Sequence, residues 1–259
     1  MSPSTKETET PEIQDSRTLA MYRVNEIFYT LQGEGCHSGI PAVFVRFSGC
    51  NLRCPWCDTE FSDYTEMTAE EIVAEALSLY DIPNERRRMV VLTGGEPSLQ
   101  VDDALVEALH AAGFYICIET NGTRHLPAGI DWITCSPKLP YHRLSQNKLT
   151  PAPSQQRGEK RNSVPLGPEI EELPLALHKV NEVKVVFTGE YDPAVWRQYL
   201  EAEHWLLQPL CYNGEWLLQS GIDEWEDDRN DNLEETVRYI LSHPFWRLSV
   251  QLHKIVGLR

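Results

Sequence analysis

The chain has few positive charges for its length and no long hydrophobic segment. Its 259 residues include 23 lysines and arginines against 39 aspartates and glutamates, for a formal net charge of −16. A nucleic-acid partner usually needs a basic surface, so this balance argues against one. No apolar run approaches the roughly 20 residues that span a bilayer, which argues against a membrane protein.

The sequence also lacks the phosphate-binding loops of common nucleotide enzymes. It has no Gly-x-Gly-x-x-Gly turn and no Walker-type loop, which disfavours a nicotinamide enzyme or a P-loop nucleotidase. It has no disulfide framework either, because its seven cysteines are odd in number and three of them cluster. This usage fits a reducing compartment, so we expect a cytoplasmic protein.

Two segments differ in composition from the rest of the chain. Residues 1–20 are polar and acidic, unlike a signal peptide or a basic transit sequence, and we predict a disordered leader. Residues 140–174 are rich in proline, serine, glutamine and charge, which predicts a loop insertion. The remainder, 21–259, is predicted to be a single α/β domain.

Buried strands alternate with helical segments along this domain. The predicted strands are 22–30, 41–47, 89–92, 114–118, 131–135, 182–187, 204–207 and 246–255. The predicted helices follow a capping box at 68–71, follow a cap at Asp102, start near Leu175, and cover 192–200 and 231–241. Such alternation predicts a parallel sheet, which binds its ligands at the C-terminal ends of the strands.

Polar motifs directly follow five of these strands. They are the cysteine loop after residue 47, Gly94-Gly95-Glu96-Pro97, Glu119-Thr120-Asn121-Gly122, Ser136-Pro137-Lys138 and Gln208-Pro209. Because the C-terminal ends of parallel strands share one edge, we expect these motifs to converge on a single active site.

The cysteine loop concentrates ligands for a soft metal. Cys50, Cys54 and Cys57 are separated by three and two residues, so their thiolates can share one centre. A structural zinc site needs four ligands, usually as paired Cys-x-x-Cys motifs, and the other four cysteines form no second pair. An iron–sulfur cluster normally takes four thiolates, so either a fourth ligand is missing or one iron is left open.

Two motifs resemble those of the radical S-adenosylmethionine (SAM) superfamily: Cys50-x-x-x-Cys54-x-x-Cys57 with Trp56 before the last cysteine, and Gly94-Gly95-Glu96-Pro97. The resemblance implies a partial (βα)6-type barrel of about six parallel strands. It also implies a [4Fe–4S] cluster whose open iron binds SAM, and an electron donor such as flavodoxin or ferredoxin. Reductive cleavage of SAM would then yield a 5′-deoxyadenosyl radical that abstracts hydrogen from a substrate.

Three further segments resemble the 7-carboxy-7-deazaguanine synthase (QueE) family: residues 26–35, 44–52 and 57–59. That family converts 6-carboxy-5,6,7,8-tetrahydropterin to 7-carboxy-7-deazaguanine with loss of ammonia, on the queuosine and 7-deazapurine pathway. The resemblance therefore implies a carbon–nitrogen lyase that uses magnesium and forms a homodimer.

The resemblance also implies site residues, matched position by position. The catalytic cluster would be held by Cys50, Cys54 and Cys57, and magnesium by Thr59. Substrate would contact Leu31, Gln32, Gly33, Glu34, Arg46 and Thr93. SAM would contact Trp56, Asp58, Gly95, Glu96, Ser136, Pro137, Lys138 and Gln208.

Other interpretations stay open from the sequence. A glycyl-radical-activating enzyme shares the cysteine spacing but is not expected to need magnesium, and a non-catalytic metal-binding regulatory protein would hold zinc. Arg46 lies in an otherwise apolar strand, so it pairs either with a substrate carboxylate or with an acid of the protein. Thr59 and Lys138 could also be ordinary loop and surface residues.

Overall fold

The computed structural model describes residues 20–54, 57, 59–60, 62–80, 88–138, 175–189, 191–210 and 231–258. The predicted leader, apart from Ala20, and the predicted insertion at 140–174 lie outside these ranges. Both stay predictions, as does the domain boundary drawn at residue 21. Trp56 and Asp58 also lie outside the described residues.

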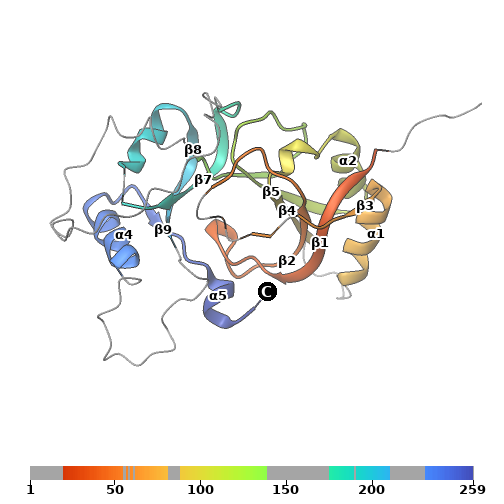
Figure 1. Ribbon diagram of the computed structural model, residues 1–259, viewed down its shortest axis with the longest axis horizontal. Helices are drawn as coiled ribbons and strands as arrows, with labels where there is room; N and C mark the ends of the chain where they lie inside the picture. Colours follow the sequence, from red (N-terminus) through yellow and green to blue (C-terminus); the bar gives the residue numbers. More distant parts are fainter. Residues whose placement is uncertain are drawn as a thin grey trace, which may run out of the picture.

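The described residues form one nine-stranded sheet in the order β3-β1-β2-β4-β5-β6-β7-β8-β9 (Figure 1). The strands are β1 (Tyr22–Leu31), β2 (Pro41–Phe47), β3 (Thr65–Met67), β4 (Arg88–Gly94), β5 (Phe114–Thr120), β6 (Trp132–Cys135), β7 (Lys179–Phe187), β8 (Glu201–Pro209) and β9 (Arg247–Leu248). From β2 to β9 neighbouring strands pair in parallel, whereas β1 pairs antiparallel with β2 and β3. The sheet has two edges and does not close, so the predicted partial barrel is confirmed.

Helices α1 (Ala69–Leu79), α2 (Asp103–Ala111) and α4 (Asp231–Ser242) cover the outside of this curved sheet (Figure 1). The described residues also form α5 (Leu252–Val256) and the short 3-10 helices η1 (Gly35–His37), η2 (Pro97–Leu99) and η5 (Pro193–Gln198). Helix α1 contacts β1, α2 contacts β5, and α4 contacts β8. The predicted capping box begins α1, since Thr68 and Glu71 each accept a hydrogen bond from the other's backbone N–H. No helix among the described residues is long and apolar enough to cross a membrane.

Strand β4 shows why the parallel strands are almost continuously apolar. Val90 and Leu92 belong to the core between the sheet and the helices. Met89 and Val91 point to the opposite face, where they pack with Phe44 in a second core inside the barrel. A strand buried on both faces has no reason to alternate apolar and polar residues.

Three predicted elements are wrong in type or length. No helix starts near Leu175, because the Ala176 backbone N–H bonds to the Gly122 carbonyl and β7 begins at Lys179. The segment 246–255 pairs only as β9, because the Leu252 backbone N–H turns to the Gly33 carbonyl and begins α5. Residues 193–198 form a 3-10 helix rather than an α-helix, and β3 was not predicted from the sequence.

We expect Asp102→Ala to lower the free energy of unfolding by about 2–3 kcal/mol. The Asp102 carboxylate caps α2 by accepting from the Leu105 backbone N–H at 3.0 Å, and it accepts from the buried Tyr22 hydroxyl at 2.6 Å. Urea unfolding measures the change. Asp103→Ala, at an exposed position in the same helical turn, should cost less than about 1 kcal/mol. Equal losses in the two variants would contradict the assignment.

Candidate active site

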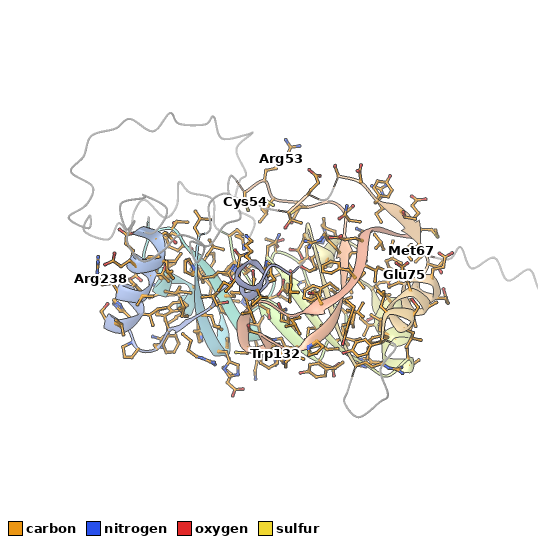
Figure 2. The ribbon with its side chains drawn as sticks, turned by 90° about the horizontal axis from the view of Figure 1, so that it is seen from below. Arg53, Cys54, Met67, Glu75, Trp132 and Arg238 are labelled. Carbon is orange, nitrogen blue, oxygen red and sulfur yellow. The ribbon has the colours of Figure 1, made fainter. Side chains whose placement is uncertain are left out.

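A cavity of about 1200 Å³ opens where the parallel strands end. Side chains near the C-terminal ends of five strands line it: Arg46 on β2, Thr93 on β4, Glu119 on β5, Lys184 on β7 and Gln208 on β8. Figure 2 shows Cys54 and Arg53 at one edge of the molecule and Trp132, which begins β6, near the opposite edge. The cysteine loop therefore covers the end of the barrel where parallel sheets bind ligands.

The cavity brings together most of the residues that the sequence analysis named. Those lining it are Leu31, Gln32, Gly33, Glu34, Arg46, Cys50, Cys54, Cys57, Thr59, Thr93, Gly95, Glu96, Ser136, Lys138 and Gln208. Pro137 is not part of the lining, and Trp56 and Asp58 lie outside the described residues. Sharing a cavity makes the predicted roles geometrically compatible, and the roles themselves stay predictions.

The cysteine loop packs directly on the turn that follows β4. The Gly95 backbone N–H donates to the Phe47 carbonyl at 3.0 Å, and the Glu96 N–H donates to the Gly49 carbonyl at 2.9 Å. A Cβ atom on Gly95 would lie 2.1 Å from the Gly49 carbonyl oxygen and 3.1 Å from Cys50 Cβ. Glycine is therefore required at position 95 for the two segments to touch.

The Glu96 carboxylate holds the ends of β4 and β5 together. It is 1% exposed and accepts hydrogen bonds from the Ser98 N–H at 3.1 Å, the Thr120 hydroxyl at 2.6 Å and the Asn121 N–H at 2.7 Å. A buried carboxylate needs such donors, and here all three come from the protein. The carboxylate thus positions the turn, while the Glu96 backbone remains part of the cavity wall.

A second contact ties the cysteine loop to the end of β5. The Asn121 side-chain amide donates to Asn51 Oδ1 at 2.9 Å, and the Asn51 amide donates to the Thr123 hydroxyl at 2.8 Å. Asn51 lies next to Cys50 in the chain, so this link restrains the loop at its first cysteine.

The three cysteines suit a soft metal by their chemistry. Burial raises the pKa of the Cys50 thiol, and the nearby Cys54 and Cys57 raise it further, so the three sulfur atoms lie close enough to influence one another. Burial also raises the pKa of Cys54, and Lys138 opposes that rise. Among the described residues no three His, Cys, Asp or Glu side chains are gathered around one point as metal ligands. The loop supplies three soft donors to the cavity.

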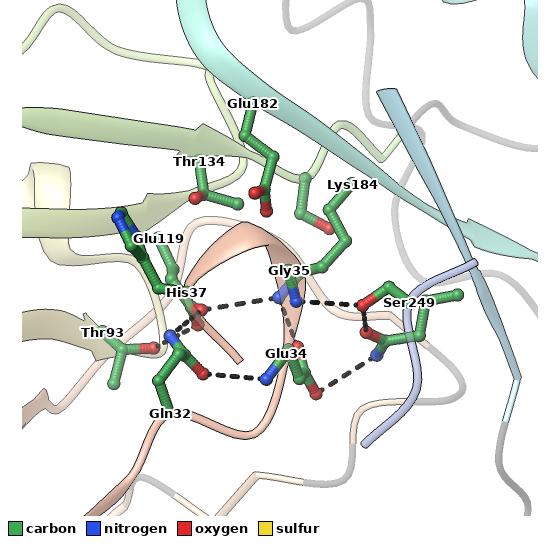
Figure 3. A network of polar contacts seen from close by, with 12 residues as sticks. Gln32, Glu34, Gly35, His37, Thr93, Glu119, Thr134, Glu182, Lys184 and Ser249 are labelled. Atoms are coloured by element: carbon green, nitrogen blue, oxygen red, sulfur yellow. Dashed lines mark hydrogen bonds and ion pairs between the residues drawn. The ribbon is translucent and has the colours of Figure 1, made fainter. Parts of the chain in front are cut away.

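A closed ring of polar contacts forms part of the cavity wall (Figure 3). The Gln32 side chain accepts from the Glu34 backbone N–H at 3.1 Å and donates to Glu119 Oε1 at 3.1 Å. Lys184 Nζ lies 3.4 Å from the same Glu119 oxygen and also pairs with Glu34 Oε2, which completes the ring. Thr93 donates to the other Glu119 oxygen at 3.3 Å.

The C-terminal segment closes the side of the barrel beside β9. The Leu252 backbone N–H donates to the Gly33 carbonyl at 2.8 Å, and the Gln251 side-chain amide donates to Glu34 Oε1 at 2.8 Å. Ser249 joins the same turn, since its hydroxyl accepts from the Gly35 N–H at 3.1 Å. In Figure 1, α5 accordingly lies between β9 and the hairpin of β1 and β2.

The electrostatics of the ring keep its charges fixed. Burial alone would raise the pKa of Glu34, but Lys184, together with Gln251 and His253, holds it at about 2. Burial would likewise lower the pKa of Lys184, yet Glu119, Glu34 and Glu182 raise it above its ordinary value. Glu34 therefore stays an anion and Lys184 a cation at any physiological pH.

Arg46 has a partner within the protein. Its Nε lies 2.8 Å from Glu26 Oε1 on β1, and its guanidinium lies 5.7 Å from the centre of the Phe28 ring. The ion pair that the sequence analysis raised as an alternative is thus present. Because the contact uses Nε, the side chain can still direct its terminal nitrogens to a ligand in the cavity that it lines.

Lys138 and Ser136 form a local unit beside the cysteine loop. Lys138 Nζ donates to the Ser136 carbonyl at 3.0 Å and also contacts its hydroxyl, so the two side chains line the cavity together. Burial lowers the pKa of Lys138, while the nearby Cys54 works against that change. Lys138 is therefore not the solvated surface lysine that the sequence also allowed.

Sequence reasoning missed three members of the ring and its surroundings. Glu119 was named only within a motif, and Lys184 and Gln251 were not singled out. Lys184 carried a usable signal, because a lysine flanked by valines in β7 is as costly to bury unpaired as Arg46 in β2. Gln251 carried none, since its contact to Glu34 joins residues 217 positions apart.

Comparison with known proteins points in one direction. Residues 44–150 match the family model of the radical SAM superfamily. The chain is 44% identical over 239 residues to a 7-carboxy-7-deazaguanine synthase of Bacteroides thetaiotaomicron, covering 92% of this chain and 100% of that protein. It is 38% identical to the enzyme of the same name from Caulobacter vibrioides, covering 92% and 99%. The crystal structure of QueE from Escherichia coli is similar, with a TM-score of 0.58, 26% identity and coverage of 90% and 95%.

Proposed function

The chain belongs to the 7-carboxy-7-deazaguanine synthase family of radical SAM enzymes, and we propose that its cavity binds 6-carboxy-5,6,7,8-tetrahydropterin beside SAM. It is a lyase of 7-deazapurine biosynthesis, and its superfamily implies a [4Fe–4S] cluster and SAM as cofactors. The observation that carries the proposal is one cavity that joins the cysteine loop to the Leu31-Gln32-Gly33-Glu34 turn. The matched relatives give no support to a glycyl-radical-activating enzyme or a regulatory protein.

The polar wall would orient the pterin by its two chemically different ends. Arg46 offers forked donors to the substrate carboxylate, as planar guanidinium groups do well. Leu31, Gln32 and Gly33 line the ring, with Glu34 and Thr93 available to its polar groups. Donors thus lie on β2 and acceptors on the turn after β1, which fixes one orientation.

The cofactors would occupy the side of the cavity under the cysteine loop. When bound, the cluster held by Cys50, Cys54 and Cys57 supplies, with SAM, the one-electron chemistry that removes a hydrogen atom from the pterin. Gly95 would present its backbone to SAM from the cavity wall, and Glu96 keeps that turn in place. Trp56, Asp58, Ser136, Pro137, Lys138 and Gln208 are the remaining proposed contacts of SAM.

Magnesium, the partners and the compartment are further parts of the proposal. Thr59 lines the cavity directly after the cysteine loop and could place a hydroxyl on a magnesium ion that keeps substrate oxygens and water as its other ligands. An oxygen-sensitive cluster suits the cytoplasm, where a flavodoxin or ferredoxin would deliver the electron. A homodimer would place a second copy of the chain against this one.

The proposed function is tested by anaerobic reconstitution of the cluster, followed by incubation with reductant, SAM, magnesium and carboxytetrahydropterin. We expect 7-carboxy-7-deazaguanine and 5′-deoxyadenosine to form together. Formation of 5′-deoxyadenosine without a deazapurine would leave the superfamily intact and remove the substrate. A rate that does not depend on magnesium would remove that ion from the proposal.

We expect Thr59→Val to raise the magnesium concentration for half-maximal rate by about tenfold. The substitution removes the hydroxyl while keeping the shape of the side chain. Titrating magnesium against product formation measures the effect, and the rate at saturating magnesium should recover. Thr65→Val, on the exposed end of β3, is the control and should leave the titration unchanged. Matching titrations in both variants would count against Thr59 as a ligand.

A further inference from the structure

Lys184 is a buried cation in the middle of β7. It lies in β7 between Val183 and Val185, both 0% exposed, and its own side chain is 6% exposed. A buried ion pair is a weak source of stability, because well-packed apolar residues in its place are often as stable. The presence of a lysine in this strand therefore calls for a reason other than folding.

The position of Lys184 supplies that reason. Its ammonium contacts Glu34 from the turn after β1 and Glu119 from β5, and both carboxylates line the cavity. The Gln32 side chain donates to the Glu119 carboxylate and accepts from the Glu34 backbone N–H, so it ties Glu119 to the turn that carries Glu34. Two carboxylates so close would repel and compete for a proton, unless a cation lies between them.

We propose that Lys184 is a positioning residue that holds Glu34 and Glu119 together as ionised acceptors for the N–H donors of the reduced pterin (Figure 3). The inference rests on the proposed function and extends it to a residue that contacts the acids rather than the reacting atoms. A pyrimidine edge rich in N–H groups is complementary to two fixed anions whose charge one ammonium partly offsets. Disordered or protonated acids would lose this complementarity.

The pH dependence follows from the groups around the ring. The charges that face it are Lys184 and Glu182 on β7, Glu119 on β5, Lys138 after β6 and His253 on α5. With Lys184 in place, Glu34 stays ionised, because its pKa is held at about 2. Without Lys184, burial and the neighbouring acid raise that pKa. Activity then falls as the pH is lowered through the raised value.

The test is the kinetics of Lys184→Met, which removes the charge and keeps an unbranched side chain. We expect KM for carboxytetrahydropterin to rise by at least about 30-fold, with a smaller fall in kcat. Substrate-free SAM cleavage should fall by less than pterin turnover does, since Lys184 contacts the two acids that are proposed to bind the pterin. Lys179→Met, on the exposed first position of the same strand, is the matched control and should behave as the wild type.

The pH profile separates a positioning role from a structural one. Between about pH 5 and 9 the wild type should show no acid limb from Glu34, whereas Lys184→Met should show one. Lys184→Arg keeps a cation and should lack that limb even if its KM is raised. An unchanged KM and profile in Lys184→Met would overturn the proposal. So would an equal loss of pterin turnover and substrate-free SAM cleavage.

The folding of the variants and the activity of the wild type decide the remaining cases. If Lys184→Met does not fold, Lys184→Gln replaces it, because an amide keeps hydrogen-bond donors without the charge, and the same acid limb is expected. If neither uncharged variant folds while Lys184→Arg does, Lys184 is a structural cation and the proposal fails.

A wild-type enzyme that makes no deazapurine removes the proposed function itself. An active wild type with an unaffected Lys184→Met removes only the positioning role.

Discussion

Gly95→Ala is expected to abolish cluster assembly and turnover. The added Cβ would lie 2.1 Å from the Gly49 carbonyl oxygen and 2.6 Å from its carbon, and both are backbone atoms that no rotamer change can move aside. The cysteine loop would have to lift from the turn after β4, breaking the hydrogen bond from the Glu96 N–H to Gly49. Because Cys50 follows Gly49 directly, the first cluster ligand would move with the loop.

Iron content, visible absorption and product formation after anaerobic reconstitution measure this effect. We expect less than about a tenth of wild-type iron and a loss of turnover of at least about 10³-fold. Gly113→Ala is the control, since Gly113 has φ of +81° after α2 with no atom within 4 Å of its added Cβ. It should cost about 1 kcal/mol of stability and leave the iron content intact. Full iron content in Gly95→Ala would show that the contact is not needed.

The parallel part of the fold was predictable because its signals are local. The parallel strands β2 and β4 to β8 each contain an apolar run bounded by turn residues, and the caps at Thr68 and Asp102 fix where helices begin. The polar motif after each strand could then be assigned to one edge from the parallel arrangement alone. This reasoning brought the cysteine loop and Lys138 to the same site without any long-range contact being known.

The parts that could not be predicted depend on contacts between distant residues. The antiparallel pairing of β1 with β2 could not be predicted, because the residue pattern of a strand does not show whether its neighbour runs parallel or antiparallel. Residues 246–255 do not form one long strand, because the Leu252 backbone N–H donates to the Gly33 carbonyl. The hydrophobic pattern of the sequence does not show this contact. Lys184 joins Glu34 across 150 positions, so its charge was visible in the sequence but its partner was not.

Cys54→Ser is expected to lose the cluster and all radical chemistry, and Cys50→Ser and Cys57→Ser are expected to do the same. A serine oxygen is a harder and less readily ionised ligand than a thiolate, and a cluster with three protein ligands has none to spare. The expected fall in product formation exceeds about 10³-fold in each variant.

The remaining cysteines decide whether one iron is left open for SAM. Cys36→Ser, Cys117→Ser, Cys135→Ser and Cys211→Ser should each bind wild-type iron and cleave SAM. Cys117 and Cys135 are buried in the two faces of the sheet, so those variants can lose stability while keeping the cluster. Electron paramagnetic resonance of each reduced variant, with and without SAM, gives a readout independent of turnover. A signal that SAM shifts in all four variants means that the fourth iron has no cysteine ligand. Loss of the cluster in any one of them would identify a fourth thiolate and close the site to SAM.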